Sequence, residues 1–272
     1  MRQFRKFSRI LFKSTLIVVL LPSSSISTMT AEATASSNPA SVAEQYLLAA
    51  ANGERLSRGL QLLQRDPVLA QAAAFHARQM ADHGDISHEF PGEPDLAARA
   101  SNAGVRFSLV AENVAVAPEA TVIHDMWMKS EGHRENLLEP HVNVAGISVV
   151  VRGGQFYAVE DFASTVESMS FDQQESTVAS LIAASGIDVA NRVKAEPAIR
   201  TARATCTMPA GYAGTRKPWF VMRYTASTLS ALPSELKNRI NTGKYHEAAV
   251  GACSSAEPGP FTAYNIAVLL YP

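Results

Sequence analysis

The sequence predicts an α+β protein made of two α+β domains in one chain. Helical spacing of apolar residues dominates from Ser41 to Lys129, and a two-residue alternation follows from Val144 to Ala163. Helix and strand patterns then recur on a smaller scale after Ser170. Hydrophobic residues make up 47% of the 272 residues and charged residues 18%, a composition that supports packed cores and is untypical of disorder.

The amino-terminal segment has the layout of a secretory signal. Basic residues precede the short apolar run Leu16 to Leu21, and small and polar residues follow it. We assign residues 1–35 to a signal peptide and linker, with cleavage near Ala31, Ala33 or Ala35. An uncleaved anchor is the alternative. The run is short for a membrane span, and after cleavage we expect no span and a secreted, periplasmic or cell-envelope location.

The charge of the chain is unevenly distributed. The formal net charge is −1, and the signal-like segment carries five positive residues, so the mature chain is acidic. This argues against a nucleic-acid partner. Residues 41–169 carry 9 basic and 17 acidic residues, whereas residues 170–272 carry 10 and 7. The change of sign favours two domains, for which we predict the boundaries 41–166 and 176–272.

Cys206 and Cys253 are the only cysteines of the chain. In an exported protein, an even pair predicts a disulfide, which stabilises by roughly 4 kcal/mol in the chain-entropy model. Two buried thiols are the alternative reading.

Local signals place the elements of the first half in order. Ser41 is a helix N-cap, and Asp66-Pro67 is a typical start for a second helix that Gly84 ends. A short helical piece, DLAARASNAG, precedes AENVAVAP, and a further helix spans Ala120 to Lys129. We expect Gly132 to interrupt that helix and His133 to open a new one.

The remaining elements follow from alternation and turn residues. VAGISVVV, the turn Gly153-Gly154 and QFYAVEDFA predict a β-hairpin. In the second half, QQESTVASLIAASG and LPSELKNRINTG read as helices. The strand patterns there are PWFVMRYTA, YHEAAVGAC and FTAYNIAVLLY. The two halves show a loose echo between their hairpins, from which no duplication follows.

Three residues from separate segments are candidates for one site. They are His88 in SHEF, Glu112 in AENVA and His133 in GHRENLL. Two imidazoles and a carboxylate can ligate a divalent cation such as Zn²⁺ or Mg²⁺. The alternative for His133 is a hydrogen bond to a neighbouring carbonyl.

Six segments in order resemble the CAP superfamily, the SCP or pathogenesis-related-1-like secreted proteins in their compact bacterial form. They are NGER, RDPVLAQAAAFHARQMADHGDISH, AENVA, W-x-x-S-x-GHRENLL, VAGISVV and FYAVEDFA, and they cover about Ser41 to Ala163. The resemblance implies an α-β-α sandwich with a cleft that two histidines and two glutamates line. By position, His88, Glu112 and His133 match three of these four residues.

The fourth position departs from the family pattern. A glutamate normally lies three residues after the tryptophan, where this chain has Ser130, with Glu131 one residue further on. An offset of one residue on a helix turns the side chain by about 100°. Glu131 is therefore only a possible ligand, and we expect weak cation binding.

The resemblance and the residues leave several functions open. The leading expectation is a secreted protein that acts by binding a lipidic or small apolar ligand, an envelope component or a protein partner. The alternative is an envelope hydrolase, either metal-assisted or built on Ser130 as nucleophile with His133 as base and Glu112 nearby. A purely structural or adhesion domain is the third reading.

Overall fold

The computed structural model describes residues 40–189, 196–255 and 259–272. The predicted signal peptide and most of the following linker lie outside the described residues. Two four-stranded sheets occur in this part of the chain, with the strand orders β1-β3-β4-β2 and β5-β7-β8-β6. We call residues 41–165 the first lobe and residues 170–272 the second lobe.

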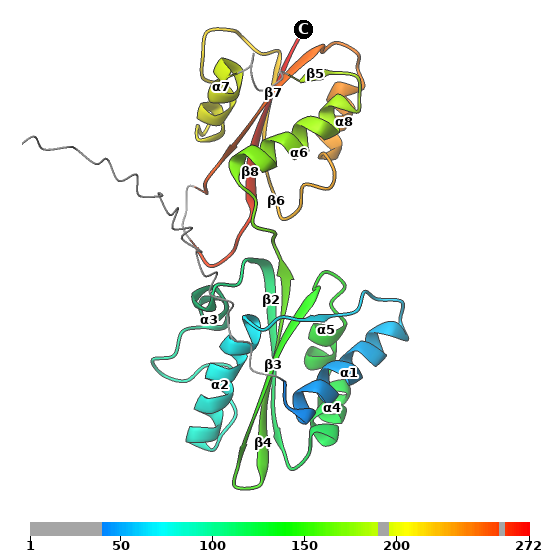
Figure 1. The fold of residues 1–272 in the computed structure, drawn as a ribbon, viewed down its shortest axis with the longest axis vertical. Coiled ribbons are helices and arrows are strands. Elements are labelled where there is room, and N and C mark those ends of the chain that lie inside the picture. The colour runs from blue at the N-terminus through cyan, green and yellow to red at the C-terminus, as the bar shows by residue number, and fades with distance from the viewer. Residues whose placement is uncertain (1–39, 190–195, 256–258) are drawn as a thin grey trace, which may run out of the picture. The chain divides into compact units, whose positions relative to one another are not determined.

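The first lobe is a three-layer arrangement of helices around one sheet (Figure 1). Within the sheet, β1 is parallel to β3, whereas β3, β4 and β2 are antiparallel neighbours. The elements are α1 (Val42–Leu56), β1 (Gln64–Arg65), α2 (Leu69–His83), α3 (Leu96–Ala103), β2 (Phe107–Ala117), α4 (Ala120–Lys129), α5 (Glu131–Leu138), β3 (Val144–Arg152) and β4 (Gln155–Thr165).

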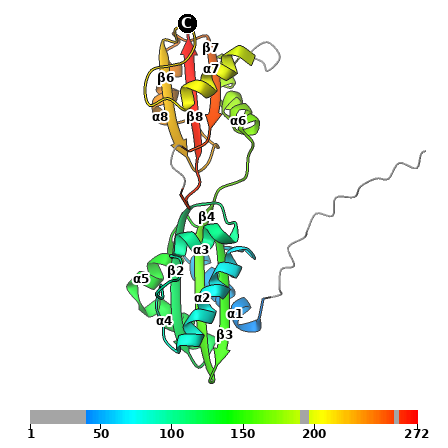
Figure 2. The same cartoon turned by 90° about the vertical axis from the view of Figure 1, so that its left-hand side faces the viewer.

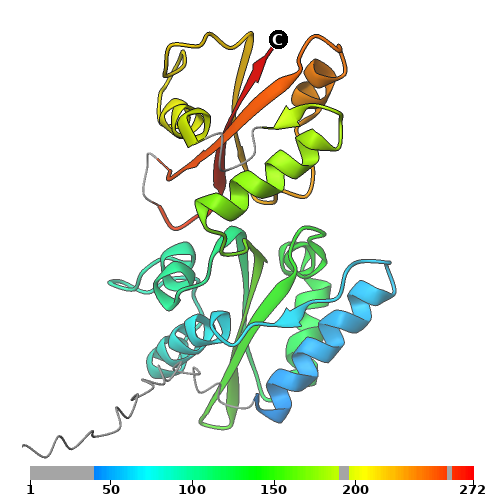
Figure 3. The same cartoon turned by 45° about the horizontal axis from the view of Figure 1, so that its top comes forward.

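Each face of this sheet has its own apolar core. Helices α1, α4 and α5 cover one face, where Leu47, Trp127 and Leu137 pack against Ile147 and Phe162. Helices α2 and α3 cover the other face, with Leu69, Ala73, Met80 and Ala100 in contact with the strands. Figure 3 shows α1 in blue and α2 in cyan on opposite sides of the sheet. The predicted α-β-α sandwich is confirmed.

Most local signals act as expected. Ser41 caps α1 in a capping box with Glu44, Gly84 ends α2 in the left-handed conformation, and α4 spans the predicted residues. Gly153 and Gly154 form the hairpin turn with positive φ angles of 58° and 76°.

Two predicted helix starts are wrong in detail. Asp66 accepts hydrogen bonds from the backbone of Val68 and Leu69, so α2 begins at Leu69 instead of Pro67. The break after α4 falls at Ser130, whose backbone is extended at φ −88° and ψ 127°. Gly132 lies inside α5, where a residue other than glycine would also fit the helical backbone. The glycine therefore does not create the turn.

The second lobe is a smaller version of the same layered arrangement (Figure 2). Strand β5 is parallel to β7, and β7, β8 and β6 are antiparallel neighbours. The elements are α6 (Phe171–Ala183), β5 (Asp188–Val189), α7 (Glu196–Cys206), β6 (Phe220–Ala226), α8 (Ser234–Ile240), β7 (Glu247–Cys253) and β8 (Tyr264–Tyr271).

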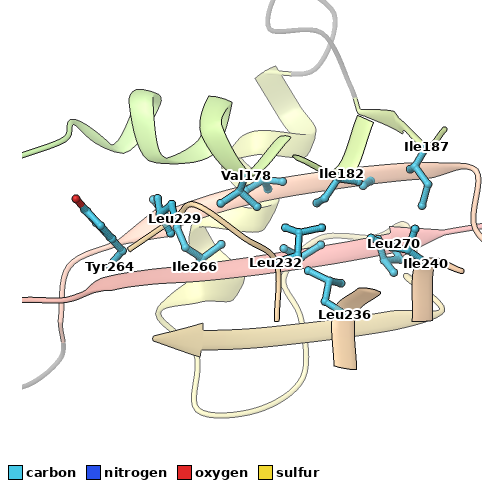
Figure 4. Close-up of a cluster of buried hydrophobic side chains, with 14 of the residues drawn as sticks. Val178, Ile182, Ile187, Leu229, Leu232, Leu236, Ile240, Tyr264, Ile266 and Leu270 are labelled. Atoms are coloured by element: carbon cyan, nitrogen blue, oxygen red, sulfur yellow. The ribbon is translucent and has the colours of Figure 1, made fainter. Parts of the chain in front are cut away.

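The larger core of this lobe lies between its sheet and the helices α6 and α8. Figure 4 shows Val178 and Ile182 of α6 and Leu236 and Ile240 of α8 gathered over β8. A smaller cluster on the opposite face joins Ala202 of α7 to β7 and β8. The predicted disulfide is confirmed: it joins Cys206 at the end of α7 to Cys253 at the end of β7.

Two further sequence-based expectations concern the whole chain. No helix among residues 40–189, 196–255 and 259–272 is long and apolar enough to cross a membrane. The domain boundaries 41–166 and 176–272 stay a prediction.

Gly146 provides a test of the close contact between α2 and β3. A Cβ added to Gly146 would lie 2.3 Å from the backbone carbon of Leu69, which cannot move without shifting α2. We expect Gly146→Ala to lower the free energy of unfolding by about 1–3 kcal/mol or more. Denaturant unfolding measures this change.

The matched control is Gly53→Ala in α1, where an added Cβ meets no atom within 4 Å. Alanine favours a helix over glycine, so this variant is expected to be as stable as the wild type or up to about 1 kcal/mol more stable. Equal stabilities of the two variants would contradict the tight packing of α2 on β3.

Candidate functional site

The structure brings His88 and Glu112 together. Glu112 lies on β2, opposite Asp161 of β4, and is 5% exposed. His88 lies in the loop after α2, and its side chain is 63% exposed. The Nδ1 atom of His88 is 2.8 Å from Oε1 of Glu112. A buried carboxylate therefore fixes the orientation of an imidazole that faces solvent.

Arg99 holds both of these residues in place. Its Nη2 atom donates to Oε2 of Glu112 in a buried ion pair. Its Nη1 atom donates to the carbonyls of His88 and Pro94, each at 3.2 Å. One guanidinium on α3 thus neutralises the carboxylate and anchors the backbone of the histidine.

The loop that carries His88 is fixed by a second buried pair. His76 on α2 has Nδ1 2.7 Å from Oε1 of Glu93 and Nε2 2.7 Å from the carbonyl oxygen of Ser87. Glu93 Oε2 also accepts from the backbone of Phe90. His76 is a core histidine whose two ring nitrogens both have hydrogen-bond partners, and these contacts hold the loop that carries His88. Sequence reasoning missed Arg99 and Glu93, because neither has a spacing that distinguishes it from a surface charge.

Helix α5 presents His133 through two asparagines. Asn113 of β2 donates to the carbonyl of His133 at 3.0 Å. Asn136 donates to the carbonyl of Glu112 and to Oδ1 of Asn113, at 3.0 and 3.1 Å. The helix is thereby tied to the strand that carries Glu112. Among the described residues, the His133 ring has no hydrogen-bond partner, so it is available to a ligand.

The carboxyl end of α5 is held by the fully buried Arg55. Its guanidinium donates to the carbonyls of Leu137 and Glu139 at 2.9 Å and to that of Val142 at 3.3 Å. These carbonyls would otherwise be unsatisfied at a helix end. The helix that bears His133 is therefore fixed at its end and along its length.

The pKa values of His88 and His133 shift in opposite directions. The hydrogen bond that the His88 ring donates to the Glu112 carboxylate raises the pKa of His88. Burial lowers the pKa of His133, and repulsion from His88 lowers it further. His88 therefore keeps its proton to a higher pH than an ordinary histidine, and His133 loses its proton at a lower pH.

A pair of buried carboxyl groups lies in β4 next to this site. Glu160 and Asp161 are fully buried on opposite faces of the sheet. Burial raises the pKa of Glu160 to about 8, and neither of its oxygens has a partner in the described part of the chain. Burial also raises the pKa of Asp161 well above its usual range, and the nearby Glu112 adds to the rise.

Ser130 and Glu131 do not join the site. The hydroxyl of Ser130 makes no hydrogen bond to a histidine in the described ranges, and the residue serves as the junction of α4 and α5. Glu131 is exposed in the first turn of α5. The geometry gives no support to Ser130 as a nucleophile or to Glu131 as a ligand.

The residues present do not fit a closed metal site. Within the described residues, no three His, Cys, Asp or Glu side chains lie close enough to hold a cation. The oxygens of Glu112 already pair with Arg99 and His88, and Ser130 stands at the fourth position. The metal role of His88, Glu112 and His133 stays a prediction, and no chemical step is derived from it.

Comparison with known proteins supports the resemblance over the first lobe. Residues 48–164 match the CAP family, described as the cysteine-rich secretory protein family. The uncharacterized protein YkwD of Bacillus subtilis (strain 168) is 32% identical over 125 residues. The alignment covers 44% of this chain and 48% of that protein, so the chain spans about half the length of this relative.

Two solved structures are also similar to this chain. An extracellular protein containing a SCP domain from Bacillus anthracis str. Ames is 28% identical, with 47% of this chain and 45% of that chain covered and a TM-score of 0.41. A cysteine-rich secretory protein (SAV1118) from Staphylococcus aureus subsp. aureus Mu50 is 22% identical, with 47% and 42% covered and a TM-score of 0.39.

Glu160 predicts a measurable pH dependence of stability. Its pKa is raised to about 8 from the ordinary value of 4.5, so the folded protein retains a proton that the unfolded chain releases between these values. Stability is therefore lost as the pH rises from 4.5 to 8, with a limiting slope of about 1.4 kcal/mol per pH unit.

We expect the stability of Glu160→Gln to depend less on pH than the stability of the wild type. The stability of the variant relative to the wild type should therefore be higher at pH 8 than at pH 5. Denaturant unfolding at several pH values measures both slopes. Glu235→Gln, at an exposed residue of α8, is the control and should leave the slope above pH 5 unchanged. Parallel curves for wild type and Glu160→Gln would show that Glu160 is ionised in the folded state.

The histidine pKa values can be measured directly. Titration followed by nuclear magnetic resonance should give His88 a pKa above the ordinary 6.5 and His133 a pKa below it. In Glu112→Gln the pKa of His88 should fall, because the partner carboxylate is lost. A pKa of His133 above that of His88 in the wild type would contradict the described site.

Proposed function

We propose that this protein is an extracytoplasmic binding protein whose ligand contacts His88 and His133, and the match of residues 48–164 to the CAP family supports this reading. The signal-like amino terminus supports the location. The binding role is supported by the local geometry around Glu112, since the buried groups there fix two histidines and leave their rings accessible.

The single observation that carries this proposal is the bond between His88 and Glu112. Glu112 is buried and Arg99 neutralises it, so the carboxylate offers little to a ligand. What the cleft exposes is the imidazole of His88, which is protonated over a wider pH range than usual. A preorganised imidazolium donates a charge-assisted hydrogen bond at low entropic cost.

This chemistry favours a ligand with an anionic or strongly polar group. We propose the head group of a lipidic or cell-envelope molecule, whose oxygen accepts from His88 while the neutral ring of His133 completes the contact. The acidic first lobe limits long-range attraction of such a ligand. Recognition therefore depends on the local pair of rings.

One feature favours hydrolysis as a second candidate. An imidazole oriented by a buried carboxylate is also the arrangement of a general base. The missing part is a nucleophile, because the Ser130 hydroxyl makes no hydrogen bond to a histidine within the residues that the structure describes. An envelope hydrolase would need a water molecule activated by His88.

The test is native mass spectrometry of the protein purified from culture medium without detergent. We expect a bound small molecule in the wild type and in His246→Ala, a control histidine in the second lobe. Occupancy should fall about tenfold or more in His88→Ala and in His133→Ala, as expected when a charge-assisted hydrogen bond is lost.

A second arm uses sedimentation with vesicles of phosphatidylglycerol and of phosphatidylcholine. The proposal expects binding to the anionic vesicles that His88→Ala reduces and His246→Ala does not. A wild-type protein that is empty and binds neither vesicle would overturn the proposal. Cleavage of an ester or peptide panel that is lost in His88→Ala would establish the hydrolase instead.

A further inference from the structure

The two lobes share one topology. In each lobe the chain forms a helix, a two-residue strand, a second helix, a long strand, a further helical segment and a hairpin, and the first lobe adds α3 between its second helix and its long strand. In the first lobe, β1 is parallel to β3, β3 is antiparallel to β4, and β4 is antiparallel to β2. In the second lobe, β5, β7, β8 and β6 are paired in the same way. Strand order and every strand direction are therefore the same in both sheets.

A pair of glycines fixes the register between the lobes. Gly146 of β3 lies against α2, where an added Cβ would be 2.3 Å from the backbone carbon of Leu69. Gly251 of β7 lies against α7, where an added Cβ would be 2.2 Å from the backbone carbon of Ala202. The same strand approaches the same helix at a glycine in both lobes.

The first helices of the lobes also correspond. Ser41 and Ser170 each begin a helix with a capping box, which Glu44 and Gln173 complete. In each lobe, a glutamate of this helix accepts a hydrogen bond from the backbone of the first hairpin strand: Glu44 from Val149 at 3.0 Å, and Glu175 from Ala252 at 2.9 Å. The capping boxes and these contacts agree with the shared topology, but the contacts differ from the glycine register by two residues, because Val149 lies three residues after Gly146 and Ala252 lies one residue after Gly251.

We infer that residues 170–272 are a second, reduced copy of the CAP fold in which the polar cleft has been replaced. Superposition through the glycines identifies the replacements. Gly146 pairs with Asp161, which pairs with Glu112. Gly251 pairs with Ala267, which pairs with Arg223. The carboxylate of Glu112 therefore corresponds to a guanidinium, and the buried Asp161 corresponds to an alanine.

The second copy is closed at this position. Arg223 Nε donates to the carbonyl of Thr205 at 2.7 Å, and its Nη2 donates to the carbonyl of Gly211. The sequence after Ser170 contains a single histidine, His246, which precedes β7. The second copy thus lacks a carboxylate at the position of Glu112 and histidines like His88 and His133. One chain therefore has one candidate site of this kind.

The same register predicts where a disulfide could be introduced into the first lobe, and this prediction tests the correspondence of the lobes. Cys206 lies four residues after Ala202, and Cys253 lies two residues after Gly251. The corresponding residues of the first lobe are Ala73 and Ser148, both buried. If the lobes are copies, Ala73→Cys combined with Ser148→Cys places two thiols where the second lobe has a disulfide with a Cα–Cα distance of 5.9 Å.

We expect this double variant to form the new bridge on air oxidation, with no free thiols and a higher denaturation midpoint than its reduced form. The control is Ala73→Cys with Ile147→Cys. Ile147 lies next to Ser148 but packs on the opposite face of the sheet, so its thiols should stay free. Circular dichroism in reductant verifies that both variants fold.

A folded Ala73→Cys/Ser148→Cys variant with two free thiols would overturn the correspondence. A second measurement does not depend on the variants: in an experimental structure of the wild type, superposing β3 and β4 on β7 and β8 should place α2 on α7. A different position of the helices would overturn it. Neither result depends on a ligand of His88, so failure here is distinguishable from failure of the proposed binding function.

Discussion

The buried ion pair between Arg99 and Glu112 joins separate segments of the first lobe. Both side chains are about 2% exposed, so each charge depends on the other for compensation. Arg99 arises from α3, Glu112 from β2, and the bonds to the carbonyls of His88 and Pro94 join the intervening loop to the same group. Removing either charge would leave the other uncompensated, at a cost of roughly 3–5 kcal/mol.

The Arg99–Glu112 pair also limits how far the oxygens of Glu112 are available to a ligand. A carboxylate that faces a guanidinium has little free capacity for a cation, and its remaining oxygen orients His88. The group that faces solvent here is the imidazole of His88, whereas Glu112 is buried. Asn113 and Asn136 hold α5 against β2, and Arg55 binds carbonyls at the end of α5. These contacts fix the parts of the candidate site in the absence of a ligand.

The sequence allowed the α+β class, the sandwich, the helix caps, the hairpin and the disulfide to be predicted, because each has a local or pairwise signal. The meeting of His88 and Glu112 came from family resemblance, since 24 residues separate them and no periodicity joins them. Helix α7 was missed because its buried face presents alanines, Ala198 and Ala202, which give a weak apolar stripe. The break at Ser130 was misplaced because glycine is tolerated within a short helix, and its presence did not require a turn there.

The disulfide is confined to the second lobe, and the first lobe contains no cysteine. A covalent link between Cys206 and Cys253 can form only after the chain meets an oxidant. The lobe that carries the cleft thus completes its fold from non-covalent contacts alone and emerges first during synthesis. Maturation of such a chain has two stages: the first lobe folds without thiol chemistry, and the second lobe gains its covalent link when Cys206 and Cys253 are oxidised.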